Sequence, residues 1–186
     1  MANYSLDKLK ILVVENHPQM RRMLVGILSA FGAGEVIGVK SGEKALAELG
    51  EGKYDLIFIT SLEGGISGID LIRKIRHEGY GTTSTLPIIM VSGRATPEYV
   101  IASRDAGSDE FLAKPYTGNL LYRHIKAVIE RRRPFVSGGD FFGPERRRRN
   151  ITSEGKDRRS IKHIYPENNE RMHNPEIEVL HENDEQ

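Results

Sequence analysis

The sequence predicts a three-layer α/β/α sandwich, in which helices cover both faces of a parallel β-sheet. Between residues 10 and 131, five short apolar runs alternate with five segments of helical periodicity. Most of the apolar runs are continuous rather than alternating, as expected for strands that are buried on both faces. Strands that alternate with helices pair in parallel through right-handed crossovers, and this connection leads to the three-layer architecture.

The predicted strands and helices follow one another regularly along this part of the chain. The expected strands are the runs ILVV, EVIGV, DLIFI, PIIMV and EFLA, at residues 11–14, 35–39, 55–59, 87–91 and 110–113. Pro18 suits the first turn of the first helix, and Ser41 suits the N-cap of the second. Isoleucines at helical spacing mark a third helix from Ile69, and Gly107 should end a fourth that starts at Pro97. Apolar residues within 120–129 mark the fifth.

Composition limits the chemistry that the chain can perform. Of its 186 residues 38% are hydrophobic, and no cysteine is present, which excludes disulfides, thiolate metal sites and a cysteine nucleophile. The N-terminus lacks the apolar core of a signal peptide. No apolar run approaches the roughly 18–20 residues that cross a membrane. We therefore expect a cytoplasmic protein without membrane contact.

The last quarter of the chain differs in composition from the rest. Pro134 cannot continue a helix, so the ordered part is expected to end near Arg133. We predict a domain over residues 1–133 and a charged, mostly disordered tail over residues 134–186. The tail turns acidic after Ile164, whereas its first part is basic and contains Arg146, Arg147, Arg148, Arg149, Arg158 and Arg159.

Polar residues follow the predicted strands at the edge where their carboxyl ends meet. Glu15 and Asn16 come after the first strand, Thr60 after the third, Ser92 after the fourth and Lys114 after the fifth. In an open α/β sheet this edge holds the functional site. The loop after Thr60 begins with Ser61, so two hydroxyls stand where a carboxylate or another reactive group is expected.

Four stretches stand out together over residues 10–131: KILVVEN, KYDLIFITSLEGGISGIDLIRKIR, LPIIMVSG and AGSDEFLAKPY. With this spacing they resemble the receiver domain of bacterial two-component response regulators. This resemblance implies a flavodoxin-like fold with strand order 2-1-3-4-5, and a signalling role rather than an enzymatic one. It also implies roles by position: Ser92 is the hydroxyl and Lys114 the lysine that contact a phosphoryl group, and Phe111 is the switch aromatic.

The chain departs from the receiver pattern at the residues that carry the chemistry. Thr60 occupies the position of the phosphoacceptor aspartate, and the acidic pair that holds Mg²⁺ in the family is here Glu15 and Asn16. A threonine hydroxyl is a poor nucleophile unless a base removes its proton. Mg²⁺ prefers anionic oxygens, and one carboxylate is left of the usual three. We expect no resident cofactor, weak Mg²⁺ binding through Glu15 at best, and no aspartyl phosphorylation.

Each of these residues also has a simpler structural interpretation. Lys114 could pair with Glu15 instead of contacting a phosphate, and Ser92 could cap the loop that follows it. Asn16 could serve only to start the first helix. Phe111 could be an ordinary core residue.

The leading hypothesis is a receiver-like signalling module that acts by protein–protein interaction. Its partner would be a histidine kinase, another receiver or an output protein. The alternative is nucleic-acid binding through the basic part of the tail, since arginines neutralise phosphates; the acidic residues beyond Ile164 would compete for those arginines. A third hypothesis, phosphorylation at Asp55, Glu63 or Asp70, is less favoured because none of them is placed like a strand-end aspartate.

Overall fold

The computed structural model describes residues 5–79, 81–130, 132–138, 141–145 and 162–164. Its main part is a five-stranded parallel sheet in the order β2-β1-β3-β4-β5. The fold class and the strand order predicted from the sequence are confirmed. The strands are β1 Lys10–Val14, β2 Glu35–Val39, β3 Leu56–Thr60, β4 Ile88–Ser92 and β5 Glu110–Ala113.

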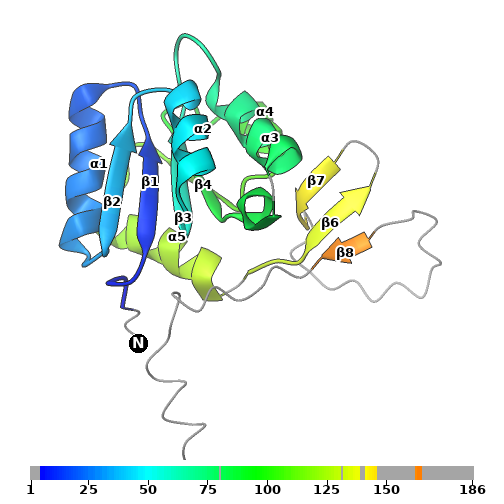
Figure 1. Cartoon of the computed structure of the whole chain (residues 1–186). Coiled ribbons are helices and arrows are strands. Elements are labelled where there is room, and N and C mark those ends of the chain that lie inside the picture. The colour runs from blue at the N-terminus through cyan, green and yellow to red at the C-terminus, as the bar shows by residue number, and fades with distance from the viewer. Residues whose placement is uncertain (1–4, 80, 131, 139–140, 146–161, 165–186) are drawn as a thin grey trace, which may run out of the picture.

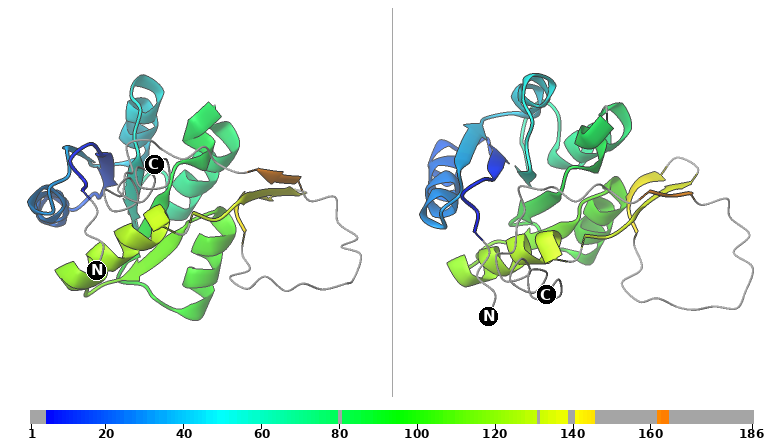
Figure 2. Two further views of the ribbon diagram at one scale, coloured as in Figure 1. Left: turned by 90° about the horizontal axis from the view of Figure 1, so that it is seen from below. Right: turned by 60° about the horizontal axis from the view of Figure 1, so that its bottom comes forward.

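Helices cover the sheet on both faces (Figures 1 and 2). They enclose two apolar cores with it. Alternate strand residues such as Leu12 and Ile57 pack against α2, α3 and α4, while Val13 and Phe58 pack against α1 and α5. Both faces are therefore buried, which explains the continuous apolar runs. In the described part of the chain, no helix is long and apolar enough to cross a membrane. The helices are α1 Pro18–Ala30, α2 Gly42–Glu51, α3 Gly68–Glu78, α4 Pro97–Ala106 and α5 Gly118–Glu130, with a 3₁₀ turn, η1, at Gly81–Thr85.

The helix signals in the sequence are confirmed at the ends of the helices. Pro18 lies in the first turn of α1, and the Ser41 side chain accepts the Lys44 N–H at 3.4 Å. Gly107 ends α4 with a φ of 106°, a left-handed conformation that glycine adopts without strain. Two strands run one residue further than predicted, so that Thr60 and Ser92 are the last residues of β3 and β4.

The expectation that order ends near Arg133 is wrong for residues 134–138 and 141–145. Strands β6 Phe135–Gly138 and β7 Phe141–Pro144 form an antiparallel hairpin, and β8 Lys162–Ile164 pairs with β6. The hairpin lies beside α3 and α4 (Figure 1), and the Phe135 side chain is fully buried. Its burial depends on a contact with α3, which local composition does not reveal. The division of the chain at Arg133 stays a prediction, and residues 146–161 and 165–186 lie outside the described residues.

Candidate functional site

The carboxyl edge of the sheet gathers the residues that the sequence predicts there. Thr60 ends β3 and Ser92 ends β4, while Glu15 and Lys114 directly follow β1 and β5. Three of the four are buried: Glu15 is 5% exposed, and Thr60 and Ser92 are each 1% exposed. Because β1, β3, β4 and β5 are consecutive in the sheet, their ends form one continuous row.

The Glu15 carboxylate is already occupied by partners from within the chain. Its Oε2 atom forms an ion pair with Lys114 Nζ at 2.9 Å, and its Oε1 atom accepts the His17 N–H at 2.9 Å. Arg21 donates to the Glu15 carbonyl at 2.7 Å, which adds a second positive charge nearby. The pairing of Lys114 with Glu15, one of the two roles considered for this lysine, is the one the structure contains.

Thr60 is turned toward the backbone of the neighbouring strand. Its Oγ1 atom donates a hydrogen bond to the Val14 carbonyl at 3.0 Å, in a buried position. A peptide carbonyl is far too weak a base to take the hydroxyl proton, so this contact does not activate Thr60 as a nucleophile. The hydroxyl instead satisfies a buried polar group and links the ends of β1 and β3.

A chain of hydroxyls, here called the hydroxyl cluster, joins Ser61, Ser92 and Tyr99. Ser61 Oγ lies 2.5 Å from Ser92 Oγ and 3.2 Å from the Tyr99 hydroxyl. Ser92 Oγ also accepts the Arg94 N–H at 2.9 Å, which is the loop-capping role considered for it. The Arg94 guanidinium lies over the Tyr99 ring, 5.4 Å from its centroid.

Sequence reasoning placed Ser61 beside Thr60 at the end of the third strand, but it did not place Tyr99 in the site. The structure keeps Ser61 at that edge of the sheet, directly after the end of β3. Nothing in the local pattern of α4 pointed to Tyr99. Its contact with Ser61 depends on how α4 packs against the sheet, and therefore on tertiary structure.

Two aromatic side chains border the site. Phe111 of β5 packs edge-on against Tyr99, with ring centroids 6.3 Å apart, and belongs to the core on the α4 side. Tyr116 follows Lys114 by two residues, and its burial raises the pKa of its phenol, with a further contribution from the negative charge of Glu15. The Tyr116 hydroxyl therefore stays protonated at neutral pH.

The oxygen donors in the site are a poor match for Mg²⁺. Glu15 supplies the single carboxylate and has both oxygens engaged, whereas Asn16 and Thr60 supply neutral oxygens. Within the described residues, no three histidine, aspartate or glutamate side chains come together as a metal site. Asn16 does not start the first helix as an N-cap, because His17 holds that position.

Comparison with protein families connects this site with a signalling domain. The family model for the response regulator receiver domain matches residues 11–126. The chemotaxis protein CheY of Pseudomonas aeruginosa is 30% identical over 123 residues, which is 66% of this chain and 98% of that protein. The six arginines of the predicted basic tail, at positions 146–149, 158 and 159, lie outside both the match and the described residues.

Two further similarities concern a longer protein and a solved structure. The transcriptional regulatory protein TcrA of Mycobacterium tuberculosis is 30% identical over 135 residues, which is 70% of this chain but 51% of that protein. The chain thus spans about half of this relative. The receiver domain of the sensor histidine kinase PA1611 from Pseudomonas aeruginosa, solved with a magnesium ion in its active site cleft, is 25% identical with a TM-score of 0.58. That match covers 63% of this chain and 94% of the other.

Proposed function

Because the chain belongs to the response regulator receiver family of two-component signalling, we propose that it works as a receiver-like module without aspartyl phosphorylation. It acts by binding a signalling protein, and we expect no enzymatic activity. The single observation that carries the proposal is the state of Thr60, whose hydroxyl at the phosphoacceptor position donates to the Val14 carbonyl.

The neighbours of Thr60 support the same proposal. In the family, the lysine after the fifth strand and the hydroxyl after the fourth contact phosphoryl oxygens. Here Lys114 is paired with Glu15, and Ser92 is hydrogen bonded to Ser61 and Arg94. Lys114 therefore has an ion-pair partner and Ser92 has hydrogen-bond partners within the chain. Neither group needs a phosphoryl group to satisfy its polar atoms.

Mg²⁺ binding should be weak for the same reason. A magnesium ion would have to displace Lys114 from Glu15, or share the carboxylate with a cation. The PA1611 receiver domain holds its magnesium ion in the active site cleft. For this chain we expect Mg²⁺ binding through Glu15 to be weak at best.

The surface of α4 is the expected place for a partner. Ile101 on α4 is an exposed large hydrophobic residue, with 47% of its surface accessible. Solitary exposed apolar residues are common, but one on a helix that also contacts the site is a reasonable anchor for an interface. The partner that we propose is a histidine kinase, another receiver or an output protein.

Capture of partners from extract of the native cell tests this proposal. The full-length chain serves as bait, next to Ile101→Asp and to Met23→Asp, whose residue on α1 is 48% exposed. We expect Met23→Asp to retain the partner and Ile101→Asp to lose it. Treating the bait with acetyl phosphate should leave capture unchanged. Capture that appears only after this treatment would refute the proposal.

A further inference from the structure

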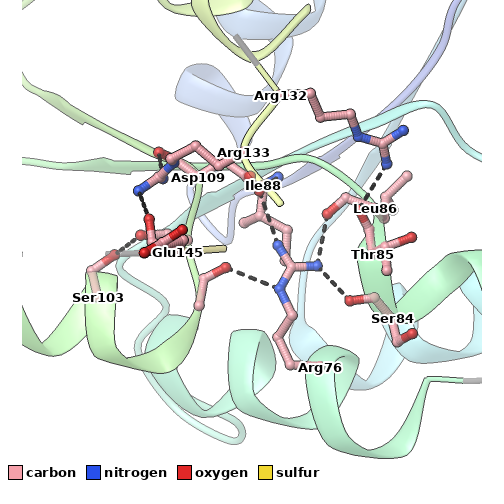
Figure 3. A network of polar contacts seen from close by, with 12 residues as sticks. Arg76, Ser84, Thr85, Leu86, Ile88, Ser103, Asp109, Arg132, Arg133 and Glu145 are labelled. Carbon is pink, nitrogen blue, oxygen red and sulfur yellow. Dashed lines mark hydrogen bonds and ion pairs between the residues drawn. The ribbon is translucent and has the colours of Figure 1, made fainter. Parts of the chain in front are cut away.

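A buried arginine lies at the edge of the sheet opposite to the candidate site. Arg76 of α3 is the largest side chain among the fully buried ones in the described residues. Its Nε donates to the Gly107 carbonyl at 2.9 Å, and its Nη1 donates to the carbonyls of Ser84 and Leu86 at 3.0 and 2.7 Å. Its Nη2 pairs with Asp109 Oδ2 at 3.0 Å (Figure 3). One side chain thus joins α3, η1, the end of α4 and the start of β5.

Asp109 extends this network to the sheet. Its Oδ2 atom also accepts the N–H of Ile88, the first residue of β4, at 2.8 Å. Burial raises the pKa of Asp109 while the Arg76 charge opposes that rise, and burial lowers the pKa of Arg76 to about 10. Arg76 remains cationic at neutral pH. A buried charge of this kind is stable only while its partners stay in place.

The C-terminal hairpin β6–β7 covers this network. The Phe135 ring lies over the Arg76 guanidinium, 5.0 Å from it, and packs against Phe142 with centroids 5.6 Å apart. Arg133 donates to the carbonyls of Asp109 and Glu145, which ties both ends of the hairpin to the domain (Figure 3). The hairpin therefore shields the guanidinium from solvent.

The hairpin also lies directly on the last turn of α4. A methyl group at Gly143 of β7 would stand 3.0 Å from the Gly107 Cα, so a larger residue would require β7 or the end of α4 to move by a few tenths of an ångström. The position needs no left-handed backbone, since the φ of Gly143 is not positive. A shift of the C-terminal end of α4 toward the hairpin would therefore displace β7.

The other end of α4 belongs to the candidate site. Tyr99, in the first turn of the helix, bonds to Ser61 in the hydroxyl cluster and packs against Phe111. At 1.5 Å per residue, the 10-residue helix α4 spans about 15 Å. One short rigid helix therefore connects the hairpin with the hydroxyl cluster.

We propose that the hairpin β6–β7 is an intramolecular control element of the receiver domain, which holds α4 in place through Arg76 and Gly107. Release of the hairpin uncovers the guanidinium, frees the last turn of α4 and loosens the contact between Tyr99 and Ser61. A protein that binds the hairpin would then act on the C-terminal end of α4. In other receivers, a phosphoryl group acts instead at the carboxyl edge of the sheet. This control does not depend on whether Thr60 is modified.

Hydrogen exchange of the full-length chain tests the coupling in variants that alter the hairpin alone. Phe135→Ala removes the ring over Arg76, and Gly143→Val pushes β7 away from Gly107. The control Phe31→Ala removes a ring of similar size that packs against Tyr122, with centroids 5.8 Å apart, beside α1 and α5. We expect both hairpin variants to speed exchange in α4 by about tenfold or more, with α1 nearly unchanged. The control should affect α1 and α5 instead.

A second readout reports on the candidate site itself. In protein labelled with 3-fluorotyrosine, the ¹⁹F signal of Tyr99 is identified from its absence in Tyr99→Phe. Phe135→Ala should shift or broaden this signal, whereas Phe31→Ala should move the signal of Tyr122 and leave Tyr99 alone. The proposal is overturned if α4 exchange and the Tyr99 signal stay as in the wild type. It is also overturned if α1 and α4 are accelerated equally, because the hairpin then contributes only to global stability. Neither readout involves phosphorylation, so the outcome is independent of the function proposed above.

Discussion

At the residue scale, the candidate site is defined by polar groups that satisfy one another. Glu15 pairs with Lys114, Thr60 donates to the Val14 carbonyl, and Ser92 is bonded to Ser61. In the function proposed here, Asn16 and Thr60 stand in place of two carboxylates of the receiver pattern, which lowers the negative charge of one small volume. The carboxylate of Glu15 is balanced by Lys114.

Restoring the missing carboxylates should restore phosphoacceptor chemistry step by step. Thr60→Asp should gain a labile phosphoryl group from acetyl phosphate and Mg²⁺, but in low yield, because Asn16 still gives Mg²⁺ a neutral ligand. Thr60→Asp with Asn16→Asp should reach a clearly higher yield in intact-mass measurements. Ser61→Asp, with its carboxylate one residue away, is the control and should gain nothing. If the double variant does no better than Thr60→Asp, this view of the site is wrong.

The Arg76–Asp109 pair should matter more for stability than an exposed ion pair on the same helix. Arg76→Gln leaves the Asp109 carboxylate buried without its cation, which should cost about 3–5 kcal/mol in the free energy of unfolding. The matched control Arg73→Gln breaks an exposed pair with Asp70 and should cost less than about 1 kcal/mol. Urea denaturation measures both. Equal losses would mean that the buried pair contributes no more than the exposed one.

The cost of Arg76→Gln should depend on pH. Burial raises the pKa of Asp109 above its usual 3.8, and removal of the opposing Arg76 charge should raise it further. A carboxyl group whose folded pKa is raised loses stability as pH rises from its unfolded pKa through its folded pKa. The deficit of the variant relative to the wild type should therefore be smaller at pH 4 than at pH 7. A deficit that stays constant between the two would show that the loss of Arg76 does not raise the pKa of Asp109 further.

The sequence was sufficient to place Glu15, Thr60, Ser92 and Lys114 at the carboxyl edge of the sheet, because each apolar run shows where its strand ends. It was not sufficient to find Tyr99, which reaches the site only through the packing of α4. Arg76 was missed for a similar reason. A lysine or arginine in a helix is usually expected to be exposed to solvent. The burial of Arg76 follows from its contacts with the carbonyls of Ser84, Leu86 and Gly107 and with the Phe135 ring.

At the element scale, the five strands and five helices were predicted to within a few residues, whereas the hairpin β6–β7 was not. The main-sheet elements carry long periodic patterns, apolar on defined faces. The hairpin has four residues per strand, and its sequence FVSGGDFFGP is rich in glycine. Two short apolar runs separated by Gly-Asp are a hairpin signal, but its stability comes from packing on Arg76 rather than from the local sequence.

The loop between β3 and α3 offers a test of how a side chain on α2 supports the site. Gly64 and Gly65 both have positive φ, 73° and 71°, but only a methyl at Gly65 would approach the Glu43 carboxylate, at 2.6 Å. Glu43 accepts the Ile66 N–H at 3.0 Å. We expect Gly64→Ala to cost about 1–2 kcal/mol for backbone strain. Gly65→Ala should cost about 1 kcal/mol more, because it also displaces Glu43 from Ile66. Equal losses in urea denaturation would show that the Glu43 contact adds nothing.

At the scale of the whole molecule, the receiver domain and the hairpin form one packed unit. β7 contacts both α3 and α4, and the network around Arg76 joins them to the sheet. A boundary placed at Arg133 from composition alone would cut through this contact. The residues beyond Glu145, apart from β8, lie outside the described part of the chain.

Truncation should reveal whether the hairpin belongs to the domain. A chain that ends at Arg133 lacks Phe135 and should be less stable than one that ends at Glu145, by about 3–5 kcal/mol for the lost aromatic burial. Thermal and urea unfolding of the two chains measure this difference. Limited proteolysis of the full-length chain should likewise leave a fragment that contains Phe135 and Phe142. Equal stability of the two truncated chains, or a fragment that ends before Phe135, would show that the hairpin does not form one packed unit with the receiver domain.

The most direct measurement for the central claim is the intact mass of the wild-type chain after incubation with acetyl phosphate and Mg²⁺. Thr60 lacks the carboxylate that forms an acyl phosphate, and its hydroxyl is held by the Val14 carbonyl. We predict no added phosphoryl group, while a receiver domain with an intact acidic site, treated in parallel, gains one. A stoichiometric, base-labile phosphoryl group on any aspartate or glutamate of this chain would contradict a receiver that signals without aspartyl phosphorylation.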